Sequence, residues 1–109
     1  MHNITVVNKK AGGKGEYIGR PSPLGNPFTS KAHGMGKRVD TVQESIAQFD
    51  AWLQAKIADR DQAVCDELDR LYVLAQQRPL QLVCWCAPGP CHGDVIKRVL
   101  EEAHSRLRP

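Results

Sequence analysis

Hydrophobic and polar residues recur along the chain with two different periods, and together these predict helices and strands. Apolar residues return at spacings of three and four over 42–57, 64–75 and 95–103, which is the period of an amphipathic helix. Two runs, 4–7 and 80–86, are short and largely apolar, which is typical of strands. The pattern therefore predicts three helices and two main strands.

Local signals mark where these elements begin and end. Thr41 and Glu44 fit a capping box, in which each side chain satisfies an otherwise unpaired N–H group at the helix start. Pro79 ends the second helix. Residues 16–19 are a shorter strand candidate, which a hairpin would pair with the first strand. The proline- and glycine-rich stretch 20–28 excludes a regular helix or a central strand and predicts an ordered loop.

The length and composition of the chain fit one small domain. Its 109 residues are 41% hydrophobic and 25% charged, as in soluble globular proteins. We therefore expect a single α/β domain over 1–109, with a short, mostly parallel sheet flanked by helices in the order β, loop or β, α, α, β, α. No apolar run is long enough to cross a bilayer, and the N-terminal residues lack the pattern of a secretion signal. These features predict a cytoplasmic protein that does not enter the membrane.

Charge is distributed unevenly along the sequence. Residues 1–38 carry seven Lys or Arg against one Glu, a net charge of +6, whereas the remainder carries eight basic and eleven acidic residues, a net charge of −3. The basic part is also rich in glycine and proline. This combination indicates loops that face an anion such as a phosphate or a nucleic-acid backbone, with a plain solvated basic surface as the alternative.

The strand ends predict where a ligand binds. In open α/β sheets, ligands bind beyond the carboxyl ends of the strands. If the two main strands are parallel, the 19–28 loop and the 86–94 turn meet at one edge, and the turn leads into a helix N-terminus that favours anions. We expect a nucleotide or a nucleotide-derived, phosphate-bearing metabolite there, and its hydrolysis or modification is left open. The predicted ligand-binding residues are Asn8, Gly19, Arg20, Ser22, Gly25, Asn26, Phe28, Cys86 and Gly93.

Two of these residues have a structural alternative. Arg20 precedes a rigid Pro-Ser-Pro turn, so it either binds phosphate through both arms of its guanidinium or anchors the loop by bonding nearby carbonyls. Asn26 either reads a base or ribose edge or holds its own turn, because Asn side chains bond the neighbouring backbone.

Two motifs in these loops resemble a known family. They read YIGRPSPLGNPF over 17–28 and CWCAPGPCHGD over 84–94. Together they resemble domain-of-unknown-function family 4326, whose members are small proteins or domains of bacteria and their phages. The similarity extends over nearly the whole chain, including the helices between the motifs. The resemblance implies no established activity and suggests a nucleotide-centred or phage–host conflict role.

The clustered cysteines allow a second function. Cys84, Cys86 and Cys91, with His92, supply the ligand set of a Cys3His zinc site, which would make the chain a zinc-stabilised protein-interaction module. The same thiols are alternatively small buried groups that line a pocket. Cys65 stands apart and is expected to be a buried hydrophobic residue.

The same turn also carries the candidate catalytic residues. Cys91 lies near a helix N-terminus beside His92, where the pKa of a thiol is expected to fall, so it is a candidate nucleophile. His92 and Asp94 are candidates for general base and orienting acid, and Asp94 is alternatively a helix cap. A third function, nucleic-acid binding through 9–38, would weaken steeply with salt. That segment offers only Tyr17 and Phe28 to stack on bases.

Overall fold

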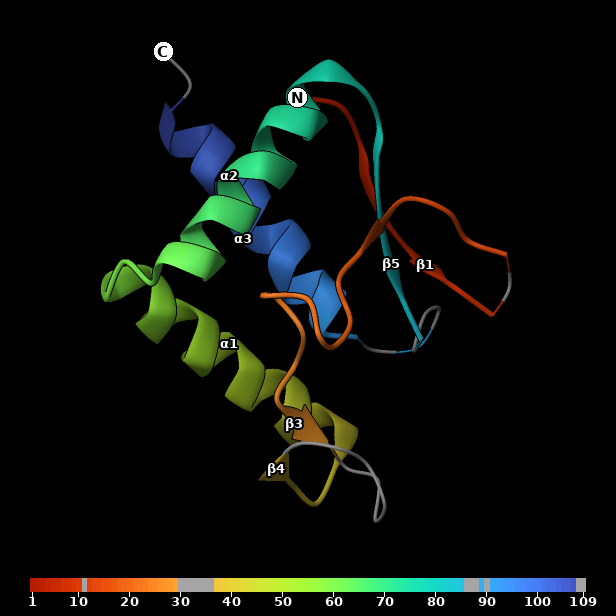
Figure 1. The fold of residues 1–109 in the computed structure, drawn as a ribbon, viewed down its shortest axis with the longest axis vertical. Coiled ribbons are helices and arrows are strands. Elements are labelled where there is room, and N and C mark those ends of the chain that lie inside the picture. The colour runs from red at the N-terminus through yellow and green to blue at the C-terminus, as the bar shows by residue number, and fades with distance from the viewer. Residues whose placement is uncertain (11, 30–36, 86–88, 90, 108–109) are drawn as a thin grey trace.

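The computed structural model describes residues 1–10, 12–29, 37–85, 89 and 91–107. These residues form a small α/β domain with a three-stranded parallel sheet and three helices, as the sequence predicts (Figure 1). The elements are β1 (Ile4–Asn8), β2 (Glu16–Tyr17), β3 (Phe28–Thr29), β4 (Lys37–Arg38), α1 (Val42–Ala58), α2 (Gln62–Gln77), β5 (Leu80–Cys84) and α3 (His92–Leu107).

The main sheet has the strand order β1-β5-β2, and both outer strands run parallel to β5. The expected parallel arrangement of the two main strands is confirmed, so their carboxyl ends share one edge. The hairpin interpretation of residues 16–19 is wrong, because β5 lies between β1 and β2. The connection therefore crosses one face of the sheet. A Cβ at Gly13 would lie 2.8 Å from Val7 Cγ2, whereas one at Gly93 in α3 would meet Val6, so the crossing uses the face opposite α3.

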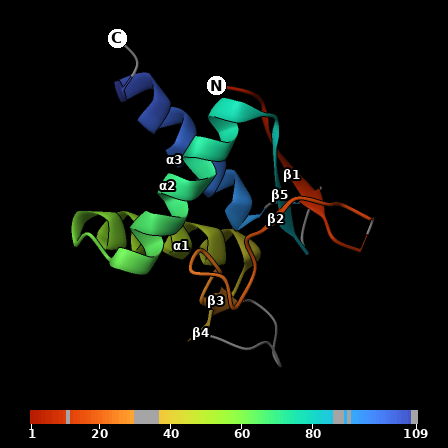
Figure 2. The ribbon, with the colours of Figure 1, turned by 45° about the horizontal axis from the view of Figure 1, so that its top comes forward.

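α2 and α3 pack on the same side of the sheet, and α1 packs against both of them (Figure 2). Leu80 and Leu82 of β5 meet Ile96 and Leu100 of α3 in the core, and all four are at most 2% exposed. Burying such side chains contributes roughly 1.5–3 kcal/mol each. Within the described residues, no helix combines the length and the hydrophobicity that spanning a bilayer requires.

The helix starts follow the sequence signals closely. The hydroxyl of Thr41 accepts a hydrogen bond from the backbone N–H of Glu44 at 3.0 Å, which confirms it as the N-cap of α1. The Glu44 carboxylate accepts from the backbone N–H of Asp40 at 3.3 Å, one residue earlier than a standard capping box. At the start of α2, the Asp61 carboxylate accepts from Val64 N–H at 3.1 Å.

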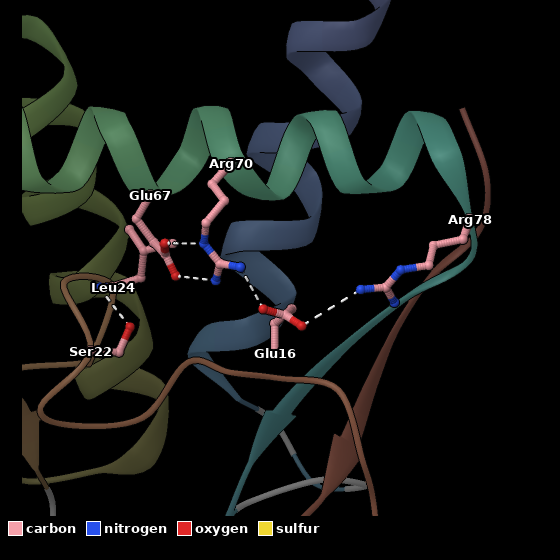
Figure 3. A network of polar contacts seen from close by, with 6 residues as sticks. All are labelled: Glu16, Ser22, Leu24, Glu67, Arg70 and Arg78. Atoms are coloured by element: carbon pink, nitrogen blue, oxygen red, sulfur yellow. Dashed lines mark hydrogen bonds and ion pairs between the residues drawn. The ribbon is translucent and has the colours of Figure 1, made fainter.

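An ion-pair network joins β2 to α2 (Figure 3). The Arg70 guanidinium lies 2.7 Å from a Glu67 carboxylate oxygen and 2.6 Å from a Glu16 carboxylate oxygen, and Arg78 reaches Glu16 at 3.7 Å. Hydrogen bonding to Glu67, and then to Glu16, raises the pKa of Arg70 above its usual value. Because β2 is only two residues long, this network helps to fix where the 19–28 loop begins.

Candidate functional site

Three strand ends and the start of α3 meet at one edge of the sheet. The pairing of β1 with β5 continues through Lys9, whose N–H donates to Cys84 O at 2.8 Å. The pairing of β2 with β5 continues through Ile18, whose N–H donates to Val83 O at 3.0 Å. His92 at the start of α3 reaches the same place, with Nε2 2.8 Å from Ile18 O. The start of α3 therefore contacts Ile18, the residue directly before the 19–28 loop.

The 19–28 loop holds itself by short-range hydrogen bonds. Ser22 N–H donates to Gly19 O and Gly25 N–H donates to Ser22 O, both at 2.8 Å. A Cβ at Gly25 would lie 2.8 Å from both the N and the Cα of Arg20, so the backbone passes there at a distance that only glycine allows. Leu24 is fully buried and anchors the loop in the core. The loop is thus an ordered element, as its sequence predicts.

Asn26 connects this loop to α1. Its Nδ2 donates to the Ser45 hydroxyl at 2.9 Å, and its Oδ1 accepts from Phe28 N–H at 2.9 Å. The Ser45 hydroxyl in turn donates to Phe28 O at 3.0 Å. These contacts match the structural alternative for Asn26, in which the side chain holds its own turn.

Arg20 has a fixed backbone and an exposed side chain. Its carbonyl accepts a hydrogen bond from the Tyr17 hydroxyl at 3.0 Å. Arg20 also lies inside the turn that the hydrogen bond from Ser22 N–H to Gly19 O closes. None of the ion pairs found among the described residues includes Arg20. Four other arginines do pair with a carboxylate: Arg70, Arg78, Arg98 and Arg106. The Arg20 guanidinium is therefore available to an external anion.

The start of α3 contains a buried row of polar groups. The sulfur of Cys91 lies 3.1 Å from that of Cys84 and 3.6 Å from His92 Nδ1. His92 Nε2 faces the carbonyl of Ile18, and because a carbonyl only accepts, Nε2 is the donor in this contact, while Nδ1 faces the Cys91 thiol. The ring of His92 also meets Phe49 edge-on at 5.0 Å. Cys84 and Cys91 are each 1% exposed.

The candidate catalytic residues are only partly assembled. Cys91 and His92 are in contact, but both ring nitrogens of His92 face groups other than Asp94. The Asp94 carboxylate accepts from Cys91 N–H at 3.2 Å, as the third residue of a helix does in a capping box. Gly93 N–H donates to Cys91 Sγ at 3.4 Å and Asp94 N–H to Cys91 O at 3.0 Å, so these two amides have internal partners.

Several predicted residues lie outside the described part of the chain. Cys86, which the sequence suggests both as a ligand-binding residue and as a zinc ligand, is one of them, as are most of the 86–90 turn and residues 30–36 of the basic segment. Among the side chains that the structure describes, no three His, Cys, Asp or Glu residues are grouped so as to hold a metal ion.

Sequence reasoning did not assign Trp85 a role and did not connect it with Tyr17. The indole Nε1 of Trp85 donates to the Tyr17 hydroxyl at 3.0 Å, and Lys9 Nζ lies 5.1 Å from the centre of the Tyr17 ring and 5.7 Å from that of the indole. The three residues stand at or directly after the ends of their strands. The strand-end rule that led to Asn8 and Arg20 applies equally to them.

Comparison with known proteins places this edge in a family context. No curated protein and no solved structure shows a significant match to the chain. A family model does match, over residues 5–102, and this span includes β2, β5, all of β1 except Ile4, and both loop motifs. The chain belongs to the family described as Domain of unknown function (DUF4326).

Proposed function

We propose that the chain binds a nucleotide, or a phosphate-bearing metabolite derived from one, at the edge formed by the 19–28 loop and the 86–94 turn. The observation that carries this proposal is the exposed Arg20, held by a rigid backbone and with no carboxylate partner among the described residues. A guanidinium binds phosphate through two parallel hydrogen bonds, and its geometry fits that ligand better than an ammonium does.

The surroundings of Arg20 support an anionic ligand. Lys9 and Lys10 are exposed at the end of β1, and Tyr17 contacts both Lys9 and the Arg20 backbone. The nearest acidic residue in sequence, Glu16, faces α2 and is bound by Arg70. Positive charges gathered at a strand edge attract phosphates and accelerate their association.

Thermal-shift and calorimetric titrations test the proposal. Mono-, di- and cyclic nucleotides are titrated into the wild type, Arg20→Ala and Arg106→Ala, where Arg106 is an exposed arginine near the end of α3. A charge-assisted hydrogen bond contributes about 1.5–3 kcal/mol, so Arg20→Ala should weaken binding by about 10- to 150-fold. Arg106→Ala should leave it unchanged. The proposal fails if no nucleotide binds the wild type, or if both variants bind equally well.

The alternative is a zinc-stabilised interaction module, in which Cys84 and Cys91, whose sulfurs lie 3.1 Å apart, would be two of the four ligands. Its test is the zinc-to-protein ratio of protein purified without chelator or added metal, followed by thermal unfolding in a chelator. Structural zinc supplies folding free energy, so a ratio near one and a lower melting temperature in chelator would support it. A metal-free protein with an unchanged melting temperature would eliminate it.

A further inference from the structure

Trp85 and Tyr17 lie side by side where β5 and β2 end, and hydrogen bonds fix both rings. The indole Nε1 donates to the Tyr17 hydroxyl at 3.0 Å, and this hydroxyl donates to Arg20 O at 3.0 Å. Asn8 Nδ2 donates to the backbone carbonyl of Trp85 at 3.1 Å. A Cβ at Gly19 would overlap the Tyr17 hydroxyl, so the phenol packs directly on glycine backbone. The two rings are therefore held in one arrangement before any ligand arrives.

The surface that Trp85 presents to solvent is apolar. The residue is 48% exposed, although aromatic side chains normally contribute most when buried. A single exposed hydrophobic residue requires no explanation by itself. An indole on an ordinary surface, however, turns its N–H toward water. Here the N–H is bound within the protein, so the side-chain surface that remains exposed consists of ring carbons.

Positive charge lies next to the rings of Tyr17 and Trp85. Lys9 Nζ is within 6 Å of both ring centres, a distance at which an ammonium is attracted to the ring electrons. The backbone of Lys9 is fixed at this edge by its hydrogen bond to Cys84 O. Arg20 is linked to the same pair through the Tyr17 hydroxyl. The edge thus combines fixed aromatic rings with two cations.

We propose that Trp85 and Tyr17 form a stacking platform for a nucleobase, so that the ligand of this edge is a nucleotide and not a phosphorylated sugar alone. This inference rests on the proposed function, in which Arg20 and Lys9 bind the phosphate, and adds recognition of the base. Stacking of one base on an aromatic side chain strengthens binding by about 5- to 150-fold. Purines, which have the larger ring system, bind more tightly than pyrimidines.

Calorimetric titration with two ligands separates the base from the phosphate. Adenosine 5′-monophosphate and ribose 5-phosphate are titrated into the wild type, Trp85→Ala and Trp85→Phe. Trp52→Phe is the matched control, because Trp52 lies in α1 and packs on Phe49. In the wild type and in Trp52→Phe, the nucleotide should bind about 5- to 150-fold more tightly than the sugar phosphate. Trp85→Ala should bring this ratio close to one without changing the affinity for ribose 5-phosphate. Trp85→Phe should keep part of it.

Fluorescence provides a readout that does not depend on affinity. The chain has two tryptophans, so Trp52→Phe leaves Trp85 as the only reporter. Adenosine 5′-monophosphate should quench its emission and ribose 5-phosphate should not. An eight-residue oligoadenylate distinguishes a free nucleotide from single-stranded nucleic acid as the source of the base. If it binds much more tightly than the mononucleotide and its affinity depends strongly on salt, the platform binds single-stranded nucleic acid. Otherwise the ligand is a free nucleotide.

The outcomes distinguish this inference from the proposed function. If both ligands bind the wild type with equal affinity, or if Trp85→Ala keeps the ratio, the platform is refuted while phosphate binding stands. If neither phosphate ligand binds, the proposed function fails. A titration with adenosine, which has a base but no phosphate, then tests the platform by itself. Quenching of Trp85 by adenosine would retain it, and unchanged emission would overturn it.

Discussion

Replacing Asn26 with alanine tests whether this residue holds the 19–28 loop in place. The substitution removes the hydrogen bonds to the Ser45 hydroxyl and from Phe28 N–H, both 2.9 Å long. Each such bond has a net contribution of about 1 kcal/mol, so the free energy of unfolding should fall by about 2 kcal/mol. For a chain of 109 residues, the entropy of unfolding is about 0.23 kcal/mol/K, which converts this loss to a melting temperature about 9 °C lower.

Two further variants provide reference values for the loss of stability expected in Asn26→Ala. Asn26→Asp keeps the acceptor for Phe28 N–H but lacks the donor to Ser45, so it should lose about half as much stability. Asn3→Ala changes an exposed asparagine and should stay within about 0.5 kcal/mol of the wild type. Urea and thermal unfolding followed by circular dichroism measure all three.

The ligand-binding interpretation of Asn26 predicts the opposite pattern. If Asn26→Ala unfolds within about 2 °C of the wild type but binds nucleotide more weakly, the side chain contacts the ligand and the structural reasoning is refuted. If the melting temperature falls as calculated, and the folded variant at low temperature still binds nucleotide, Asn26 positions the loop and does not contact the ligand.

Two other substitutions test the packing and the charges of α3. Gly93→Ala places a Cβ 2.9 Å from Ile18 Cδ1 and Val6 Cγ1, so overpacking should lower the free energy of unfolding by about 1–3 kcal/mol, measured in urea; a neutral result would contradict the close approach of α3 to the sheet. Hydrogen bonding to Arg98 lowers the pKa of Asp50. The pair therefore stabilises the fold fully at pH values above the pKa of Asp50 in the unfolded chain, and this stabilisation is lost as the pH falls through the lower pKa of Asp50 in the folded state. The stability difference between the wild type and Asp50→Asn should therefore be at most about 1 kcal/mol at pH 7, because both side chains are partly exposed, and should vanish near pH 2. An equal difference at both pH values would contradict the assignment.

The sequence predicts the helices well because their signals are local. The cap at Thr41 and the stop at Pro79 depend on residues within one helical turn, and each occurs where expected. The parallel pairing of β1 with β5 follows from their strand character and from the helices between them. These features need no knowledge of distant contacts.

The position of β2 was not predictable in the same way. A strand of two residues carries almost no periodic signal, and its partner β5 lies more than sixty residues later. The short connection from β1 favours a hairpin, but β5 is the most apolar strand, and pairing on both of its edges satisfies its backbone groups. The strand that pairs with β2 is therefore distant in sequence, and this pairing brings Tyr17 close to Trp85.

Burial explains why the start of α3 and the exposed edge take different roles. The sequence predicts an anion site at this helix start, where amide groups lack helical partners. In the fold, however, Cys91 and His92 turn inward, and Cys91 accepts hydrogen bonds from the first amides of the helix. The cations and aromatic rings nearest to solvent belong to the neighbouring strand ends, where the Tyr17 hydroxyl accepts from Trp85 Nε1 and donates to the Arg20 carbonyl. A ligand that arrives from solvent would meet these groups first, so the proposed recognition of base and phosphate belongs to the strand ends, while the buried imidazole contacts the Ile18 carbonyl just before the loop.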